Sequence, residues 1–203
     1  MSENASPDHG VMYCQMTYRP VKGACSVTFI SNQKFCWEIS VGQPVAEEWP
    51  EDVVFRMNPE SPTNVALVDH ISNHEGMLLA SPRLRDFLRD QALPNLEFLK
   101  VAIIDHKGRV AAEDYSVVNC CRVVDCVDQK SSEFKWDGLD NPSMEMERMV
   151  LDPATVGADD RMIRPRYVPA LVLYRMDLVE AIRDRKFTGV GFRRTVFGDD
   201  ERY

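Results

Sequence analysis

The sequence predicts an α+β fold with a mixed or mostly antiparallel sheet and few helices. One observation is that short apolar or alternating runs, separated by Gly and Pro, recur along the chain as they do in proteins with several strands. Another is that the two clearest helical patterns lie in segments of similar sequence, residues 77–98 and 171–192. Each segment has the pattern of a strand, a helix and a strand, so we expect two pseudo-repeated units.

The helix of the first unit has a clear N-terminal signal. Ser81 can accept a free backbone N–H with its side-chain oxygen, and Pro82 suits the first turn because it has no N–H to leave unpaired. Apolar residues then follow at the spacing of one helical face, namely Leu84, Phe87, Leu88 and Ala92. The sequence therefore predicts a helix that begins after Ser81 and buries this face.

The second unit aligns with the first without a gap, so that Leu178 takes the place of Leu84. We expect Asp177 to cap its helix, and Gly189 to turn the chain into a last strand. Two copies allow pseudo-symmetry but not a solenoid, which needs about three repeats. The residues expected to point inward are Leu178, Ala181 and Ile182.

The N-terminal part of the chain has the pattern of strands. Residues 11–18 and 25–30 alternate weakly, and residues 35–41 place apolar side chains at every second position. We expect these three segments to form an antiparallel group of strands. The inward face of the third would consist of Phe35, Trp37, Ile39 and Val41.

An acidic loop is expected at residues 42–52, because Gly and Pro punctuate this segment. A tryptophan in a loop is often a lid on the core. An aromatic residue among carboxylates is also typical of a binding hot spot, so the loop is our first candidate site. The candidate residues are Glu47, Glu48, Trp49, Glu51 and Asp52.

Turn-forming segments divide the chain into parts. Residues 58–63 are the best boundary, which gives a β-rich part over residues 1–60 and an α+β part over residues 61–203, packed as one compact unit. Residues 101–105 are expected to form a buried strand. Residues 115–127 are the most strand-like segment and should lie centrally in a sheet.

Charge narrows the class of partner. The formal net charge of −8 argues against a nucleic-acid binder, whose affinity comes largely from neutralising phosphates. Residues 1–60 hold 4 basic and 8 acidic residues, a net of −4, whereas residues 161–194 hold 9 basic and 3 acidic residues, a net of +6. Both parts could be solvated faces, or the acidic part could face a basic partner.

The compartment follows from the termini and the cysteines. The N-terminus is polar, and no stretch of apolar residues is long enough to cross a membrane, so we expect a soluble cytoplasmic protein. The 6 cysteines include no CxxC pair, so we expect buried free thiols and no bound metal.

Catalytic signals are sparse, and no cofactor motif is present. His70 and His74 would share a face if residues 69–75 were helical, with Asp69 and Glu75 beside them. An enzyme with a site at these four residues is therefore one alternative. Another is a homo-oligomer that uses the methionine-rich residues 144–151.

Motifs in three parts of the chain resemble the bacterial immunity-protein family of polymorphic toxin systems, first described from a myxobacterial member. The first motif is Gly-x-Pro with a nearby Trp-Pro, and the second is Tyr-x-Val-x-Asn with a following Val-Asp pair. The third is a helix that ends in Thr-Gly-Val-x-Phe. The matching residues are Gly42, Pro44, Trp49, Pro50, Tyr115, Val117, Asn119, Val124, Asp125, Thr188, Gly189, Val190 and Phe192.

The chain departs from the family pattern at one place. Family members tend to have Ser-Glu before the last helix, where this chain has Tyr174 and Arg175. The resemblance implies a protein that binds a cognate toxin without catalysis and needs no cofactor. A basic toxin such as a nuclease would be attracted to the acidic loop, with Asp159 and Asp160 as further contacts.

Overall fold

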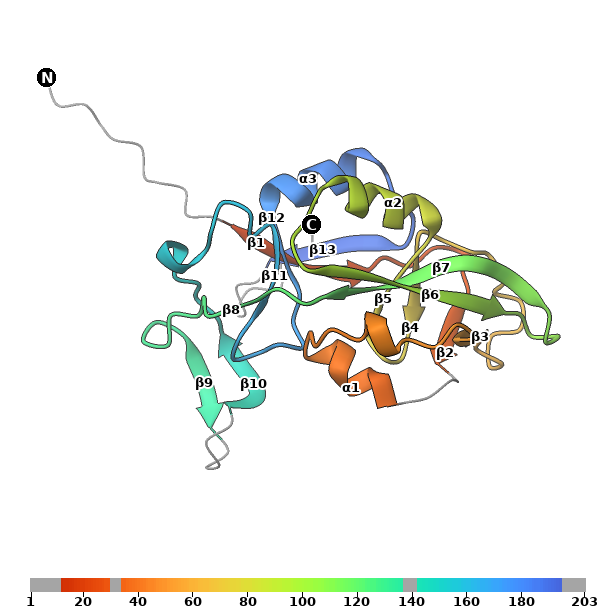
Figure 1. The fold of residues 1–203 in the computed structure, drawn as a ribbon, viewed down its shortest axis with the longest axis horizontal. Helices are drawn as coiled ribbons and strands as arrows, with labels where there is room; N and C mark the ends of the chain where they lie inside the picture. Colours follow the sequence, from red (N-terminus) through yellow and green to blue (C-terminus); the bar gives the residue numbers. More distant parts are fainter. Residues whose placement is uncertain (1–11, 30–33, 137–141, 195–203) are drawn as a thin grey trace, which may run out of the picture.

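The computed structural model describes residues 12–29, 34–136 and 142–194, which contain two mixed sheets and three α-helices (Figure 1). One sheet closes into a barrel of β2 (Ser26–Phe29), β3 (Val54–Met57), β6 (Leu96–Ile104), β7 (Val110–Cys120), β5 (Leu78–Ala80) and β4 (His70–Asn73), in that order. The other has the order β13 (Val190–Arg194), β1 (Tyr13–Tyr18), β12 (Leu173–Arg175), β11 (Met162–Pro165) and β8 (Val123–Val124). A separate hairpin pairs β9 (Glu133–Trp136) with β10 (Pro142–Arg148).

Both sheets contain parallel and antiparallel pairs. In the barrel, β2 is parallel to β4 and β3 is parallel to β6, while the other neighbours are antiparallel. In the second sheet only β8 and β11 are parallel. The predicted α+β class with a mixed sheet is therefore confirmed.

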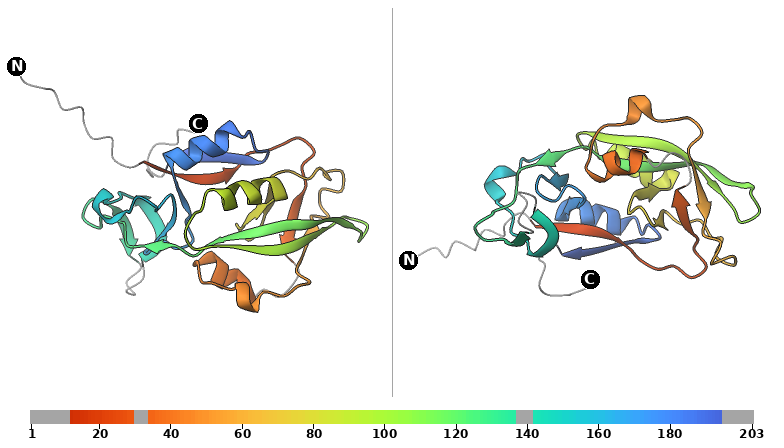
Figure 2. Two further views of the ribbon diagram at one scale, coloured as in Figure 1. Left: turned by 45° about the horizontal axis from the view of Figure 1, so that its top comes forward. Right: turned by 90° about the horizontal axis from the view of Figure 1, so that it is seen from below.

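The helices lie on opposite sides of the strands. α2 (Pro82–Asp90) and α3 (Met176–Asp184) lie on one side, and α1 (Lys34–Ser40) lies on the other (Figures 1 and 2). The rings of Phe87 and Phe187 meet edge to face at 5.3 Å between centroids. This contact joins the regions of α2 and α3 in a shared core, which also contains Leu84, Leu88, Leu178, Val179 and Ile182.

The N-terminus of α2 confirms the predicted cap, and that of α3 does not. The hydroxyl oxygen of Ser81 accepts the backbone N–H of Leu84 at 3.2 Å, as an N-cap should. In α3 the N-cap position is Arg175, whose side chain caps nothing. Asp177 lies inside the first turn, and its carboxylate accepts hydrogen bonds from the guanidinium groups of Arg161 and Arg175 instead.

The two similar segments have the same order of elements. β5, α2 and β6 follow one another in the first, and β12, α3 and β13 in the second. In each case the two strands flank a third strand and run antiparallel to it, β7 in the barrel and β1 in the other sheet. The duplication itself stays a prediction.

The predicted strand at residues 35–41 is wrong, because this segment is the helix α1. Phe35 and Ile39 are 4% and 3% exposed, and a separation of four residues brings two side chains to the same side of a helix. The same geometry turns Trp37 to the opposite side, where it is 69% exposed. The alternating apolar residues therefore do not mark a strand, because Phe35 and Ile39 form the buried face of a helix and Trp37 lies on its exposed face.

The predicted antiparallel N-terminal group is also wrong. The strands at β1 and β2 exist, but β1 belongs to the open sheet and β2 to the barrel. The central strand expected over residues 115–127 is right only for residues 115–120, which belong to β7 between β5 and β6, whereas residues 123–124 form β8 at the edge of the other sheet. After β7 the chain enters β8 and so connects the two sheets. The boundary near residue 60 stays a prediction.

The cysteines of the described residues form no disulfide. Cys14, Cys25, Cys120 and Cys126 are buried, and Cys36 and Cys121 are half-buried. None of the helices that the structure describes is long and apolar enough to cross a membrane.

Candidate partner-binding surface

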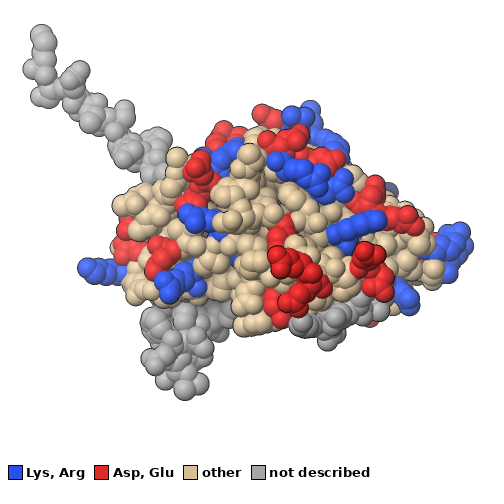
Figure 3. Space-filling model, in the orientation of Figure 1, with Lys and Arg blue, Asp and Glu red and all other residues tan. Residues whose placement is uncertain are grey.

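The acidic loop at residues 42–52 leaves the C-terminal end of α1 and contains a short 3-10 helix, η1 (Ala46–Glu48). Its four carboxylate residues are all exposed. Figure 3 shows acidic side chains gathered where Figure 1 places η1 and β3, whereas acidic and basic side chains mix over α2 and α3. The exposed residues are Glu47, Glu48, Glu51 and Asp52.

Trp49 anchors this loop to the barrel. Its indole N–H donates to the carbonyl oxygen of Lys100 in β6 at 2.9 Å, and its ring lies 5.4 Å from that of Phe35 between centroids. The side chain is half-buried and packs against the barrel core. Trp49 therefore has the geometry of the lid on the core, and the neighbouring carboxylates remain accessible.

Glu97 and Asn119 hold the start of η1. The carboxylate of Glu97, on β6, accepts the backbone N–H of Val45 at 3.0 Å and that of Ala46 at 3.0 Å. Asn119, on β7, donates from its amide nitrogen to Glu97 at 2.9 Å and to the carbonyl oxygen of Gln43 at 2.8 Å. These bonds satisfy the free N–H groups at the start of η1 and fix the loop on the barrel.

Arg164, on β11, fixes the end of α1 from which the loop starts. Its guanidinium group donates to the carbonyl oxygens of Cys120 at 2.7 Å, Ser40 at 3.0 Å and Ile39 at 2.9 Å. The side chain is 5% exposed, and burial lowers its pKa. The last carbonyls of α1 carry partial negative charge, so they stabilise the buried guanidinium in place of a carboxylate.

Gly42 lets Arg164 approach. It has a φ of +74°, and a Cβ atom there would lie 2.7 Å from Cδ of Arg164 and 2.8 Å from the carbonyl oxygen of Cys120. Only glycine combines this backbone conformation with this contact. The Gly-x-Pro motif in the sequence therefore has a structural cause, because it marks where the loop crosses the buried arginine.

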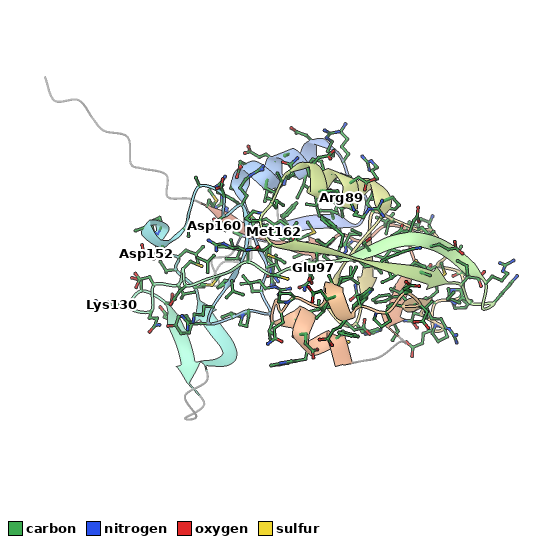
Figure 4. The ribbon with its side chains drawn as sticks, in the orientation of Figure 1. Arg89, Glu97, Lys130, Asp152, Asp160 and Met162 are labelled. Carbon is green, nitrogen blue, oxygen red and sulfur yellow. The ribbon has the colours of Figure 1, made fainter. Side chains whose placement is uncertain are left out.

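The two C-terminal candidates lie elsewhere and differ from each other. Asp159 is exposed, whereas Asp160 is 3% exposed and its carboxylate accepts hydrogen bonds from Arg122 at 2.6 and 3.2 Å. The bond to Arg122 lowers the pKa of Asp160, although its burial opposes that change. Asp160 lies apart from Glu97 (Figure 4), so the fold does not gather these residues with the acidic loop.

The four residues of the alternative enzyme site do not share a helical face. Residues 70–73 are the strand β4, so the helical arrangement that would align His70 with His74 and Glu75 is wrong. Burial lowers the pKa of His70 to about 4, which leaves its ring neutral at pH 7. The carboxylate of Asp69 is occupied by Ser81, Arg83 and Thr188. Among the described residues, no group of His, Cys, Asp and Glu side chains could hold a metal ion.

A groove of about 610 Å³ lies beside α3 and the start of β13. Its lining includes the basic residues Arg19, Arg183 and Lys186 but no carboxylate, cysteine or histidine. The described residues that line the groove therefore include no carboxylate or imidazole that could act as a general base.

The structure describes the methionine-rich residues 144–151 only in part. The backbone of residues 144–148 belongs to β10, but the side chains of these residues lie outside the described part of the structure. Met149 is 3% exposed and belongs to the core cluster that contains Ile163 of β11. A role of this segment in self-association stays a prediction.

Sequence reasoning found the acidic loop and missed the residues that position or border it, which are Glu97, Arg164 and Trp37. Glu97 and Arg164 act through contacts with chain segments far away in the sequence, so no local pattern reveals them. For Trp37 a signal existed in the spacing of Phe35 and Ile39, which fits a helix as well as a strand.

Comparison with known proteins supplies the family. A family model described as "Immunity protein family (Imm11)" matches residues 16–196. The matched range begins within β1 and includes the other described strands, the three described helices and the acidic loop. No curated protein matches the chain.

Proposed function

Because the chain belongs to the Imm11 immunity protein family, we propose that it neutralises a cognate toxin in the cytoplasm by binding it, without catalysis. The proposed contact residues lie in the acidic loop, and the proposed toxin presents a basic surface, as a nuclease does. These residues are Glu47, Glu48, Trp49, Glu51 and Asp52, with Asp159 as a weaker candidate and Asp160 the weakest, since its carboxylate already binds Arg122.

The observation that carries this proposal is a set of exposed carboxylates on a fixed loop. Glu97 and Asn119 hold the first half of the loop, and Arg164 holds the helix end that precedes it. A fixed loop loses little conformational entropy on binding, which favours affinity. Clustered negative charge raises the rate at which a basic partner docks, because it attracts the partner before contact.

Coexpression with the protein encoded by the adjacent gene tests this function. We expect that protein to be toxic alone, harmless when this chain is present, and bound to it in a purified 1:1 complex. The association rate should fall as salt concentration rises, because exposed charges are screened. Absence of both protection and a complex would refute the proposed function.

A further inference from the structure

Trp37 is the most exposed of the large hydrophobic side chains that the structure describes, at 69%. It lies on α1, whose other side is buried through Phe35 and Ile39. Removing an aromatic side chain of this size from water is favourable. The fold itself does not bury this side chain, so a partner could gain free energy by covering it. Tryptophan is one of the residue types enriched among the residues that dominate protein interfaces.

Acidic residues lie on this helix, near it and in the loop that follows it. Glu38 is next to Trp37 on α1, and Glu75 comes from the turn between β4 and β5. Both influence Cys36, since burial first, and then the negative charges of Glu75 and Glu38, raise the pKa of its thiol. The acidic loop follows directly, because the backbone N–H of Gln43 donates to the carbonyl oxygen of Glu38 at 2.8 Å.

The last turn of α1 is held in place by Arg164. Its bonds to the carbonyl oxygens of Ile39 and Ser40 join the helix to β11 on the other sheet. The backbone N–H of Val41 donates to the carbonyl oxygen of Trp37 at 3.1 Å, so the residue that carries the indole belongs to the same fixed turn. An aromatic side chain on a fixed backbone loses little freedom when it is covered.

We propose that Trp37 is the anchor of the recognition surface, and that an arginine of a basic partner stacks on its indole ring while the exposed carboxylates of the acidic loop pair with that partner. A guanidinium group suits this place because it is planar, positively charged and weakly hydrated. The acidic residues of α1 and of the loop that follows it disfavour an anionic lipid surface as the occupant. That the partner is a toxin rests on the proposed function, whereas its positive charge and its stacking arginine do not.

The first arm of the test uses an arginine-rich peptide as the probe and the whole chain as the receptor. Trp37→Ala should weaken peptide binding about 3- to 10-fold at low salt, the size expected for a partly desolvated cation–π contact. Trp37→Phe should recover part of the affinity. Val110→Ala is the matched control, because Val110 is also exposed, at 52%, but lies at the start of β7 away from α1. It should bind as the native chain does.

The outcomes separate the two proposals. Equal peptide affinity of the native chain and Trp37→Ala, with unchanged thermal unfolding, would overturn the role of Trp37, and so would failure of the native chain to bind the peptide. The second arm repeats the comparison with the product of the adjacent gene. If that protein does not bind the native chain while peptide binding still depends on Trp37, the proposed function fails and the anchor stands.

Discussion

Asp69 and Thr188 are 119 residues apart in the sequence and hold the barrel and the second sheet together. The carboxylate of Asp69 accepts the backbone N–H of Thr188 at 2.8 Å and its hydroxyl group at 2.9 Å. The hydroxyl oxygen of Thr188 accepts the backbone N–H of Asp69 at 2.9 Å. This pair places the end of the α3 unit against the start of β4, and Ser81 adds the cap of α2 to the same carboxylate.

Replacing Asp69 by Asn should destabilise the fold in a pH-dependent manner. Burial alone would raise the pKa of Asp69, but the hydrogen bonds from Thr188 and Ser81 and the charge of Arg83 lower it below its ordinary value. The carboxylate therefore stabilises the fold above the unfolded pKa of about 4, and this contribution is lost as pH falls through the lower folded pKa. We expect Asp69→Asn to cost about 1.5–3 kcal/mol at pH 7.

Chemical unfolding of the native chain and the variant between neutral and acidic pH measures this effect. The difference in unfolding free energy should shrink once pH falls below about 4. Asp86→Asn is the control, because Asp86 is exposed on α2 and bonds only to neighbouring arginines on the surface in the described structure. A difference that does not change with pH would contradict the role assigned to the ionised carboxylate.

Gly189→Ala should destabilise the fold more than the same change at Gly108. Both glycines have positive φ, +78° and +76°, so alanine is strained at either position. Strain of this kind costs about 1–3 kcal/mol. At Gly189 a Cβ atom would also lie 2.2 Å from the carbonyl oxygen of His70, whereas at Gly108 nothing lies within 4 Å. Equal losses of thermal stability would show that this close approach has no energetic weight.

Arg164→Lys should loosen the last turn of α1 and the start of the acidic loop. Lysine keeps the charge but lacks the planar fork that reaches several carbonyl oxygens, so we expect a loss of about 1.5–3 kcal/mol. Amide hydrogen exchange should become faster at Val41 and Gly42, whose N–H groups bond to carbonyls within α1. Arg166→Lys is the control, because its side chain is 68% exposed. Unchanged exchange in both variants would refute the coupling of β11 to the loop.

Glu97→Gln should free the start of η1 without unfolding the barrel. The neutral amide of glutamine accepts weaker hydrogen bonds than a carboxylate, so the N–H groups of Val45 and Ala46 should exchange faster. Glu113→Gln removes the same charge from an exposed position on β7 and should leave that exchange unaltered. Similar exchange at Ala46 in the two variants would show that Glu97 does not hold the loop.

Local chemistry in the sequence predicted the fold where neighbouring residues determine it. Ser81 and Pro82 begin α2 because capping depends on residues within one turn. Asp177 is not the cap of α3 because the helix begins one residue before it, with Arg175 at the N-cap position, and its carboxylate binds Arg161 and Arg175 instead. The prediction of a strand at the segment with Trp37 was wrong because a run of seven residues fits the period of a strand and that of a helix. Only packing against the barrel core determines that Phe35 and Ile39 share a helical face.

The candidate site also has one part that the sequence predicts and another part that it does not. The exposed loop carboxylates could be found from composition, because charge and turn residues are properties of the sequence. The function of Gly42 could not, since its constraint is the side chain of Arg164, more than a hundred residues away. The sequence likewise does not show that β1 and β2 belong to different sheets, because this depends on their pairing partners. β1 pairs with β12, near the C-terminus, whereas β2 pairs with β3.

The association rate of the chain with its toxin is the most direct test of the acidic loop. The variant carries Glu47→Gln, Glu48→Gln, Glu51→Gln and Asp52→Asn. A control with the same change in net charge carries Asp86→Asn, Asp90→Asn, Glu180→Gln and Asp184→Asn, all exposed on α2 and α3. We expect the loop variant to associate about tenfold more slowly at low salt with little change in dissociation rate, and the control to associate nearly as fast as the native chain. Equal association rates for the native chain and the loop variant would contradict the assignment of the loop as the toxin-binding surface.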